Sequence, residues 1–175
     1  MQLRLIPLLS LITPLLAATT PDPNPILTAL NTISSDTTTL NNTVASWDGN
    51  ILTLLEITVQ SGKLLAAIND GTKTANKADN LTLTQTLDVA TAKLNLATGV
   101  NQTITTIIGA KPKFDKLLVV SPVILLNLKL EQDASRDFSA AVVAKVPADL
   151  QGIAQGLTQP IDDSFSEGIA VYEAW

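Results

Sequence analysis

The stretch PILTALNTISSDTTTLNNTVASW, residues 25–47, carries the pattern that decides the fold. Its apolar side chains and one threonine recur at alternating steps of three and four residues. The members of this series are Ile26, Leu30, Ile33, Thr37, Leu40, Val44 and Trp47. Such spacing forms one stripe of an amphipathic helix of about 22 residues, and the following Asp48-Gly49 is a pair at which helices end.

A second helical pattern, residues 51–75, is apolar around most of its circumference. Only a narrow face is polar, formed by Thr53, Glu56, Gln60 and Lys63. A helix of this kind is central in a bundle or meets apolar surroundings on more than one side. Residues 69–72, with the sequence NDGT, weaken the pattern and predict an end or a bend there.

Three more patterns follow the polar link at residues 73–80. The third has its stripe at Leu83, Leu87, Ala90, Leu94, Ala97, Ile104 and Ile108. The fourth begins with a short piece around residues 114–120. It restarts at Ser121-Pro122, a capping residue followed by a proline, and stops before Pro147. The fifth, residues 150–172, contains Pro160, which should kink it. We therefore predict an all-α fold, in which residues 19–175 form a single-domain bundle of about five amphipathic helices.

The composition excludes several classes of function. The 175 residues include no Cys and no His, so disulfides, the usual zinc and haem ligand sets and Cys or His nucleophilic relays are not expected. Sixteen acidic residues against eleven basic ones give a net charge of −5, which disfavours nucleic-acid binding. We expect no cofactor and no metal.

The amino-terminal residues 1–18, MQLRLIPLLSLITPLLAA, have the features of a secretory signal peptide. The later apolar run at residues 117–128 is too short and too interrupted to span a membrane, and the carboxyl end lacks a GPI signal. The sequence thus predicts a secreted, released protein without a transmembrane segment. Asn41, Asn80 and Asn101 each begin a sequon for N-glycosylation.

No group of residues suggests catalysis. The carboxylates of Glu131, Asp133, Asp137 and the Asp162-Asp163 pair are expected on the solvated sides of their helices. The Asn69-Asp70-Gly71 segment has too few oxygen ligands for a calcium loop. We predict that the protein is not an enzyme.

The remaining signal is an excess of apolar residues, 46% of the chain, with a mean hydropathy of +0.29. The bundle could enclose a cavity for a fatty acid or another apolar ligand, or its helices could open onto a hydrophobic surface. A third alternative is a structural glycoprotein of the cell wall or matrix with a filled core. The residues expected to line the interior are Leu55, Val59, Leu65, Leu94, Ile104, Leu128, Phe138, Leu157, Ile161 and Phe165.

Two hydroxyls on the apolar side of the second pattern, Thr58 and Ser61, are candidate polar anchors for a fatty-acid carboxylate. Gly62 beside them would leave space. The alternative is that both hydroxyls donate back to the carbonyl four residues earlier in the helix.

Three short stretches carry a resemblance to a known family: AINDGT at residues 67–72, KPKFD at 111–115 and AKVPADL at 144–150. In this order and spacing the chain resembles the fungal hydrophobic surface-binding protein A family, which includes cell-wall galactomannoproteins. The resemblance implies a secreted or wall-associated, non-enzymatic domain of about five helices. It also implies binding to hydrophobic solid surfaces, fatty-acid binding in some members, and a secreted hydrolase such as a cutinase as a partner.

Overall fold

The computed structural model describes residues 24–117 and 119–174, and throughout these residues the regular structure is helical. The predicted signal peptide at residues 1–18 lies outside the described residues. The α-helices are α1 (Pro25–Ala45), α2 (Ile51–Lys77), α3 (Leu83–Phe114), α4 (Val120–Val143), α5 (Gln151–Gly156) and α6 (Gln159–Glu173), and a 3₁₀ turn, Ala148–Leu150, precedes α5.

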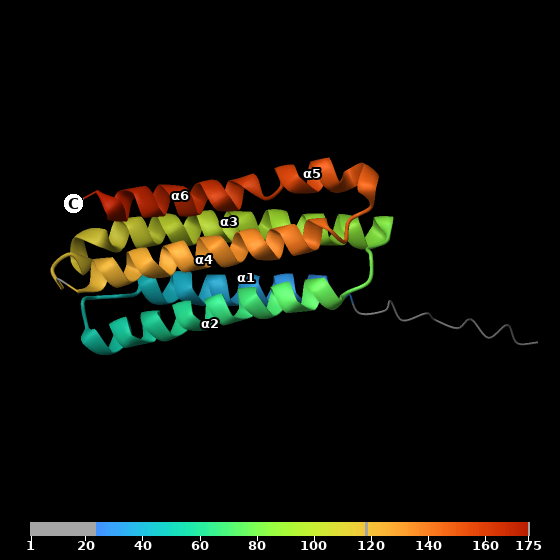
Figure 1. Ribbon diagram of the computed structural model, residues 1–175. Helices are drawn as coiled ribbons and strands as arrows, with labels where there is room; N and C mark the ends of the chain where they lie inside the picture. Colours follow the sequence, from blue (N-terminus) through green and yellow to red (C-terminus); the bar gives the residue numbers. More distant parts are fainter. Residues whose placement is uncertain (1–23, 118, 175) are drawn as a thin grey trace, which may run out of the picture.

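The long helices run alternately up and down and form a ring (Figure 1). Helix α1 packs against α2 and α3, α4 packs against α2, and α6 closes the ring between α3 and α4. Helices α5 and α6 follow one another along α3 and together make up the fifth predicted helix. The predicted all-α bundle of five helical segments is therefore confirmed.

Local sequence sets the helix starts. The Asn24 side chain accepts hydrogen bonds from the amides of Ile26 and Leu27, and the Asn50 side chain caps α2 in the same way. Thr82 and Gln85 form a reciprocal capping box at the start of α3. Along α1 the predicted stripe is the buried face, from Ile26 to Val44, with Trp47 buried just beyond it.

Two glycines, Gly71 and Gly168, let helices approach closely. Gly71 also explains why the predicted end or bend of the second helix at residues 69–72 is wrong. Helix α2 continues through residues 69–72 to Lys77 without ending there. A β-carbon added to Gly71 would lie 3.1 Å from Phe138 Cε2 and 3.3 Å from Ile33 Cδ1, so glycine serves close packing at this position. Gly168 of α6 plays the same part, since a β-carbon there would lie 3.0 Å from Ile104 Cγ2.

Two helices start at other positions than the sequence predicts. Helix α4 starts at Val120, and Ser121 is a buried residue inside it that donates to Asp115 Oδ1 at 2.6 Å, so it does not cap the helix. Pro160 lies in the first turn of α6. The fifth pattern is accordingly broken into two helices just before this proline, because proline suits a helix start and disrupts a helix interior.

Aromatic side chains close one end of the bundle. Trp47, just beyond the end of α1, stacks on Phe114, at the end of α3, with ring centroids 4.4 Å apart. Tyr172, near the end of α6, is fully buried and donates its hydroxyl to the carbonyl of Ile107 on α3 at 2.8 Å. We therefore expect a ligand to reach the interior at the opposite end of the bundle.

Candidate functional site

An apolar cavity lies at that opposite end, between α3, the end of α4 and the α5 segment. Its volume is about 150 Å³. Helix α5 and the 3₁₀ turn before it contain no buried residue, and α5 packs mainly on α4. Helix α5 thus forms a lightly packed cover over this space. The cavity is lined by Thr86, Leu87, Val89, Ala90, Lys93, Val142, Val143, Val146, Leu150, Ile153, Ala154 and Leu157.

Among the described residues of this lining, Lys93 is the one with a charged side chain. It stands in the first half of α3 with 6% of its surface exposed, and its Nζ donates to Ser139 Oγ of α4 at 3.0 Å. Burial lowers the pKa of Lys93 from 10.5 to about 8, because the charged amine is poorly solvated there. No carboxylate forms an ion pair with it among the described residues.

The Lys93–Ser139 pair stands where three spaces meet. Lys93 lines both the apolar cavity and a central cavity of about 20 Å³. Ser139 lines the same central cavity and also an outer groove of about 520 Å³ between α4 and the α5–α6 segment. A polar headgroup entering from the groove would reach this pair before the apolar interior.

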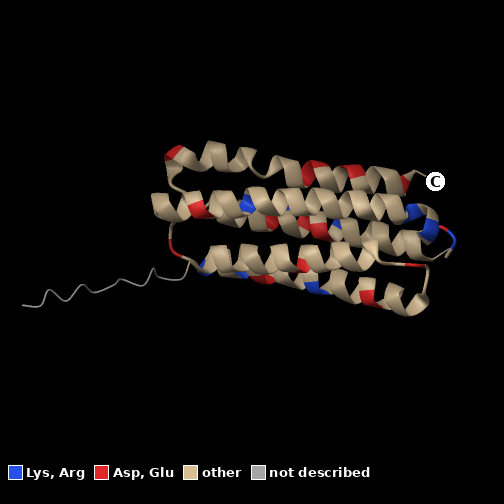
Figure 2. Ribbon diagram, turned by 180° about the vertical axis from the view of Figure 1, so that it is seen from behind, with Lys and Arg blue, Asp and Glu red and all other residues tan. Residues whose placement is uncertain are grey.

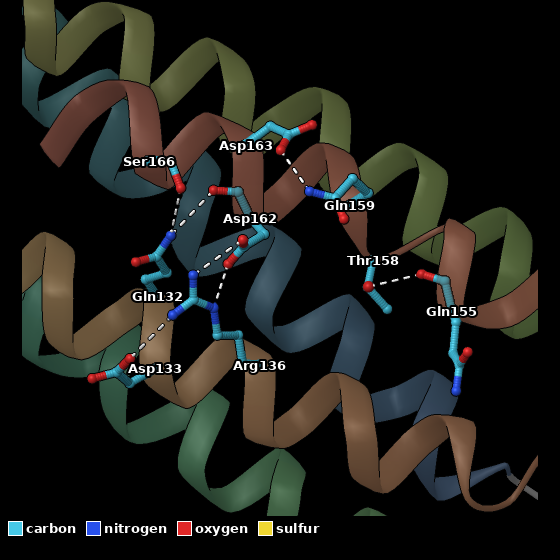
Figure 3. A network of polar contacts seen from close by, with 9 residues as sticks. All are labelled: Gln132, Asp133, Arg136, Gln155, Thr158, Gln159, Asp162, Asp163 and Ser166. Atoms are coloured by element: carbon cyan, nitrogen blue, oxygen red, sulfur yellow. Dashed lines mark hydrogen bonds and ion pairs between the residues drawn. The ribbon is translucent and has the colours of Figure 1, made fainter. Parts of the chain in front are cut away.

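A polar network holds the wall of the groove (Figure 3). Arg136 of α4 binds both carboxylate oxygens of Asp162 on α6, and Gln132 donates to the Asp162 carbonyl and to Ser166 Oγ. Figure 3 shows Arg136 and Gln132 reaching from α4 toward α6. This network joins α4 to α6 next to the break between α5 and α6, and it occupies the guanidinium of Arg136 with a carboxylate.

Glu131 is a second buried ionisable group. Its side chain accepts a hydrogen bond from Ser61 Oγ at 2.7 Å, beside another cavity of about 20 Å³. Burial raises the pKa of Glu131 from 4.5 to about 7, and the Ser61 hydrogen bond opposes this shift. The expectation of a solvated Glu131 is wrong, because this residue faces α2 across the helix contact.

The predicted lining residues divide into two groups. Ile104, Leu128, Phe138, Ile161 and Phe165 are buried in the bundle core, Leu65 is partly buried against it, and Leu157 is partly buried. Leu55, Val59 and Leu94 are at least 49% exposed, so placing them in the interior was wrong. The error on α2 has a simple cause: a pattern that is apolar all round does not specify which side faces the core.

The two predicted anchors also separate. Thr58 is exposed and donates to the Leu54 carbonyl four residues earlier, so it offers no interior anchor. Ser61 is buried, but its hydroxyl is engaged by Glu131, a group that would repel a carboxylate once ionised. Gly62 faces outward into open space and leaves no room inside the bundle.

Sequence reasoning missed Lys93 because the stripe was assigned one position out of phase in the first part of α3, from Leu83 to Leu94, although Ala97 and Ile104 were placed correctly. The buried face runs through Thr86, Val89, Lys93, Leu96 and Val100. The polar residues Thr86 and Lys93 hide this stripe from a search for apolar spacing. The regular steps of three and four from Val89 to Val100, with a lysine among them, were the available signal.

Exposed apolar residues of two neighbouring helices lie on the outside of the bundle. Helices α2 and α4 pack side by side, run in the same direction and begin at the same end (Figure 1). Figure 2 shows that charged residues are sparse on the helices, with lysines gathered near the α3–α4 turn. We call the exposed apolar residues of α2, of α4 and of the residue just before α4 the outer α2–α4 face: Ile51, Leu52, Leu55, Val59, Val119, Val123, Leu126 and Leu130.

By length and composition, α2 is also the one helix among the described residues that could cross a membrane. Only 22% of its most apolar 18-residue window is buried in the bundle. Its Ser61–Glu131 hydrogen bond and its packing on α1 and α4 nevertheless tie it to the other helices. The high hydropathy of α2 therefore reflects its exposed outer face.

The three sequons have different surroundings. Asn80 is exposed in the connection between α2 and α3. Asn41 lies on α1 and accepts a hydrogen bond from Thr106 Oγ1 at 2.8 Å, and Asn101 on α3 donates to Ser164 Oγ at 3.4 Å. Of the three, Asn80 offers the side chain best placed to carry a glycan.

Comparison with known proteins identifies the relatives of this chain. A family model described as Hydrophobic surface binding protein A matches residues 23–144. Cell wall mannoprotein 1 of Aspergillus flavus is 27% identical over 94% of this chain and 58% of its own length. The protein of the same name from Aspergillus fumigatus is 27% identical over 85% and 51%, respectively. The chain thus spans little more than half of these relatives.

Solved structures share the fold. A crystal structure of AfMP4P in complex with palmitic acid is 27% identical, with a TM-score of 0.80 over 84% of this chain and 97% of the other. Ligand binding domain 2 of the Penicillium marneffei MP1 protein, complexed with multiple arachidonic acids, has a TM-score of 0.82 over 90% and 99%. At 18% identity, the second likeness shows the fold alone.

Proposed function

Because this chain belongs to the hydrophobic surface binding protein A family, we propose that it binds a fatty acid in the interior of its helical bundle. The observation that carries the proposal is the apolar cavity of about 150 Å³ beneath α5. Its described lining comes from α3, the end of α4 and the segment around α5, and within that lining Lys93 is the lone charged group. The palmitic acid of AfMP4P, a protein of the same fold, supports this class of ligand.

The size of the cavity predicts how a long chain would be accommodated. Sites for small ligands usually measure about 300–1,000 Å³. The cavity beneath α5 is smaller, and the central cavities of about 20 Å³ each hold no more than about one water molecule. We therefore expect α5 to shift outward when the acyl chain enters, since it has the least packing to lose.

Filling this cavity should weaken the binding of a fatty acid. In Ala154→Phe the added ring would occupy the space between α5 and α3, and we expect the affinity for palmitic acid to fall at least about 10-fold. Isothermal titration of palmitic acid into delipidated protein measures it. Ala66→Phe, the same change at an exposed position of α2, is the matched control and should bind like the unaltered protein. Unchanged affinity in Ala154→Phe would place the ligand elsewhere.

A second candidate function is adsorption to hydrophobic solids, favoured by the outer α2–α4 face. Adjacent exposed apolar residues from two helices form an area that water solvates poorly, as at protein and membrane interaction sites. This mode needs no cavity and no opening of helices. It is therefore separable from fatty-acid binding by experiment.

Polar substitutions on this face test adsorption. The double variant Leu55→Gln, Leu126→Gln should lose several-fold in capacity on octyl-coated beads, because it interrupts the apolar area on both helices. Its affinity for palmitic acid should be unchanged. If adsorption persists and the near-ultraviolet circular dichroism signal disappears on the beads, the helices open and the outer face is not the binding surface.

The setting of these functions is also a proposal. We propose that the chain acts outside the cell or in the cell wall, as the name of its mannoprotein relatives suggests. Fatty-acid and surface binding are non-catalytic functions, and recruitment of a secreted hydrolase such as a cutinase to an adsorbed layer stays a prediction. Co-sedimentation of a cutinase with protein-coated beads would test that partner.

A further inference from the structure

The buried amine of Lys93 is costly unless something compensates its charge. A charged group moved from water into an apolar interior loses most of its solvation, and proteins usually supply a counter-charge. Within the described residues Lys93 has a single hydrogen-bond partner, the neutral hydroxyl of Ser139, at 3.0 Å. An amine in this position is suited to an anion that arrives from outside the chain.

Both members of the pair keep donors that the protein leaves unused. An ammonium group has three N–H donors, and Ser139 Oγ takes one of them. The Ser139 hydroxyl accepts that hydrogen bond, and no hydrogen bond that it donates is found among the described residues. Two adjacent side chains from α3 and α4 can therefore donate to the same oxygen pair.

The spaces on either side of the Lys93–Ser139 pair favour an anion with an apolar tail. On one side of Lys93 lies the almost wholly apolar cavity beneath α5, and on the other side Ser139 borders the outer groove. An anion with a linear apolar tail satisfies both sides at once, because its head meets the amine while its tail fills the cavity. A small inorganic anion would leave the cavity empty.

We propose that Lys93 and Ser139 form the headgroup site of this protein and that the site selects free fatty acids, whose carboxylate accepts from both side chains, over neutral lipids of equal length. This inference rests on the proposed function, since it names the head that the cavity takes. It also separates the roles of the buried lysine, Lys93, and the buried glutamate, Glu131. Glu131, already paired with Ser61, lies on the α2 side of α4 and offers a carboxylate no attraction.

Two other cations, Arg136 and Lys145, do not replace Lys93. Arg136 borders the outer groove, but its guanidinium is bound by both oxygens of Asp162. Lys145 donates to the carbonyls of Asn76 and Ala78, which ties it to the end of α2. Lys93 is therefore the interior amine from which headgroup selection is expected.

The decisive comparison uses the unaltered, delipidated protein with palmitic acid and with 1-hexadecanol, which has the same chain length and no carboxylate. Both are titrated by displacement of a fluorescent fatty acid. Because hydrogen bonds to charged groups are the strong ones, we expect palmitic acid to bind about 10- to 100-fold more tightly. Equal affinities for the acid and the alcohol would overturn the headgroup site and leave the proposed function intact. Binding of neither would refute the proposed function itself.

Variants then locate the preference. Lys93→Met keeps the apolar stem and removes the amine, so it should lose the preference for the acid while binding the alcohol as before. Ser139→Ala should lose part of the preference, about 3- to 10-fold. Lys129→Met, an exposed lysine of α4, is the matched control and should keep the preference in full. A Lys93→Met protein that still prefers the acid would overturn the assignment.

Discussion

Replacing Phe138 by Ala should lower the free energy of unfolding by about 3–5 kcal/mol, the range found when a buried phenylalanine is truncated. The ring is 5% exposed and packs closely against Gly71 of α2, next to Ile33 of α1. Because these helices are already in close contact there, they have little freedom to collapse into the space that the ring would leave. This loss is a large fraction of the stability of a typical domain. Denaturation by urea, followed by circular dichroism, measures it.

The same variant carries a functional consequence. Phe138 lines the central cavity together with Lys93, so truncation should join new apolar space to the proposed headgroup site. Saturating palmitic acid should then restore more stability to Phe138→Ala than it adds to the unaltered protein. Phe138→Leu, which keeps most of the volume, is the control and should cost less than about 1.5 kcal/mol. A loss below about 1 kcal/mol for the alanine variant would contradict the packing described here.

Replacing Glu131 by Gln should remove a pH dependence of stability. The folded protein holds the Glu131 proton up to a pKa of about 7, whereas the ordinary value is 4.5. Between these values the folded state binds more protons than the unfolded state, so the free energy of unfolding falls as pH rises. The total fall from this group is roughly 3 kcal/mol at about 1.36 kcal/mol per pKa unit.

The glutamine amide of this variant would keep an oxygen that accepts from Ser61 but could not ionise. Glu131→Gln should therefore be more stable than the unaltered protein at neutral pH and above, and indistinguishable from it near pH 4. Urea titrations between pH 4 and 7 avoid the region where Lys93, with its pKa of about 8, loses its proton. Glu56→Gln, at an exposed position of α2, should leave the fall unchanged. Parallel pH curves for Glu131→Gln and the unaltered protein would show that burial does not govern this carboxyl.

The α1 and α2 stripes show what periodicity can and cannot predict. In α1 the apolar positions occupy a single face, so the pattern alone identified every buried residue from Ile26 to Val44. In α2 the apolar residues surround the helix, and periodicity left the orientation open. Contact with α1 and α4 then placed Ile57 and Leu64 inside and left Leu55 and Val59 on the outer α2–α4 face.

The candidate site was less predictable than the fold, for a related reason. Lys93 and Glu131 are charged, and charged residues are almost never fully buried unless they are paired, so a sequence reading assigns them to solvent. Their burial follows from the register between helices: Lys93 of α3 meets Ser139 of α4, and Glu131 of α4 meets Ser61 of α2. These contacts join residues 46 and 70 positions apart in the chain.

The sequence by itself determined that this protein is a bundle of amphipathic helices with apolar character in excess of a simple core, because helix formation and amphipathicity depend on residues three and four positions apart. The tertiary structure alone decided where the excess goes. Packing in a ring turned part of it outward on α2 and α4, left an apolar cavity beneath α5, and set a lysine amine at its edge. Those outcomes depend on which helix faces meet, and each such meeting is settled by the shape and burial of both partners together.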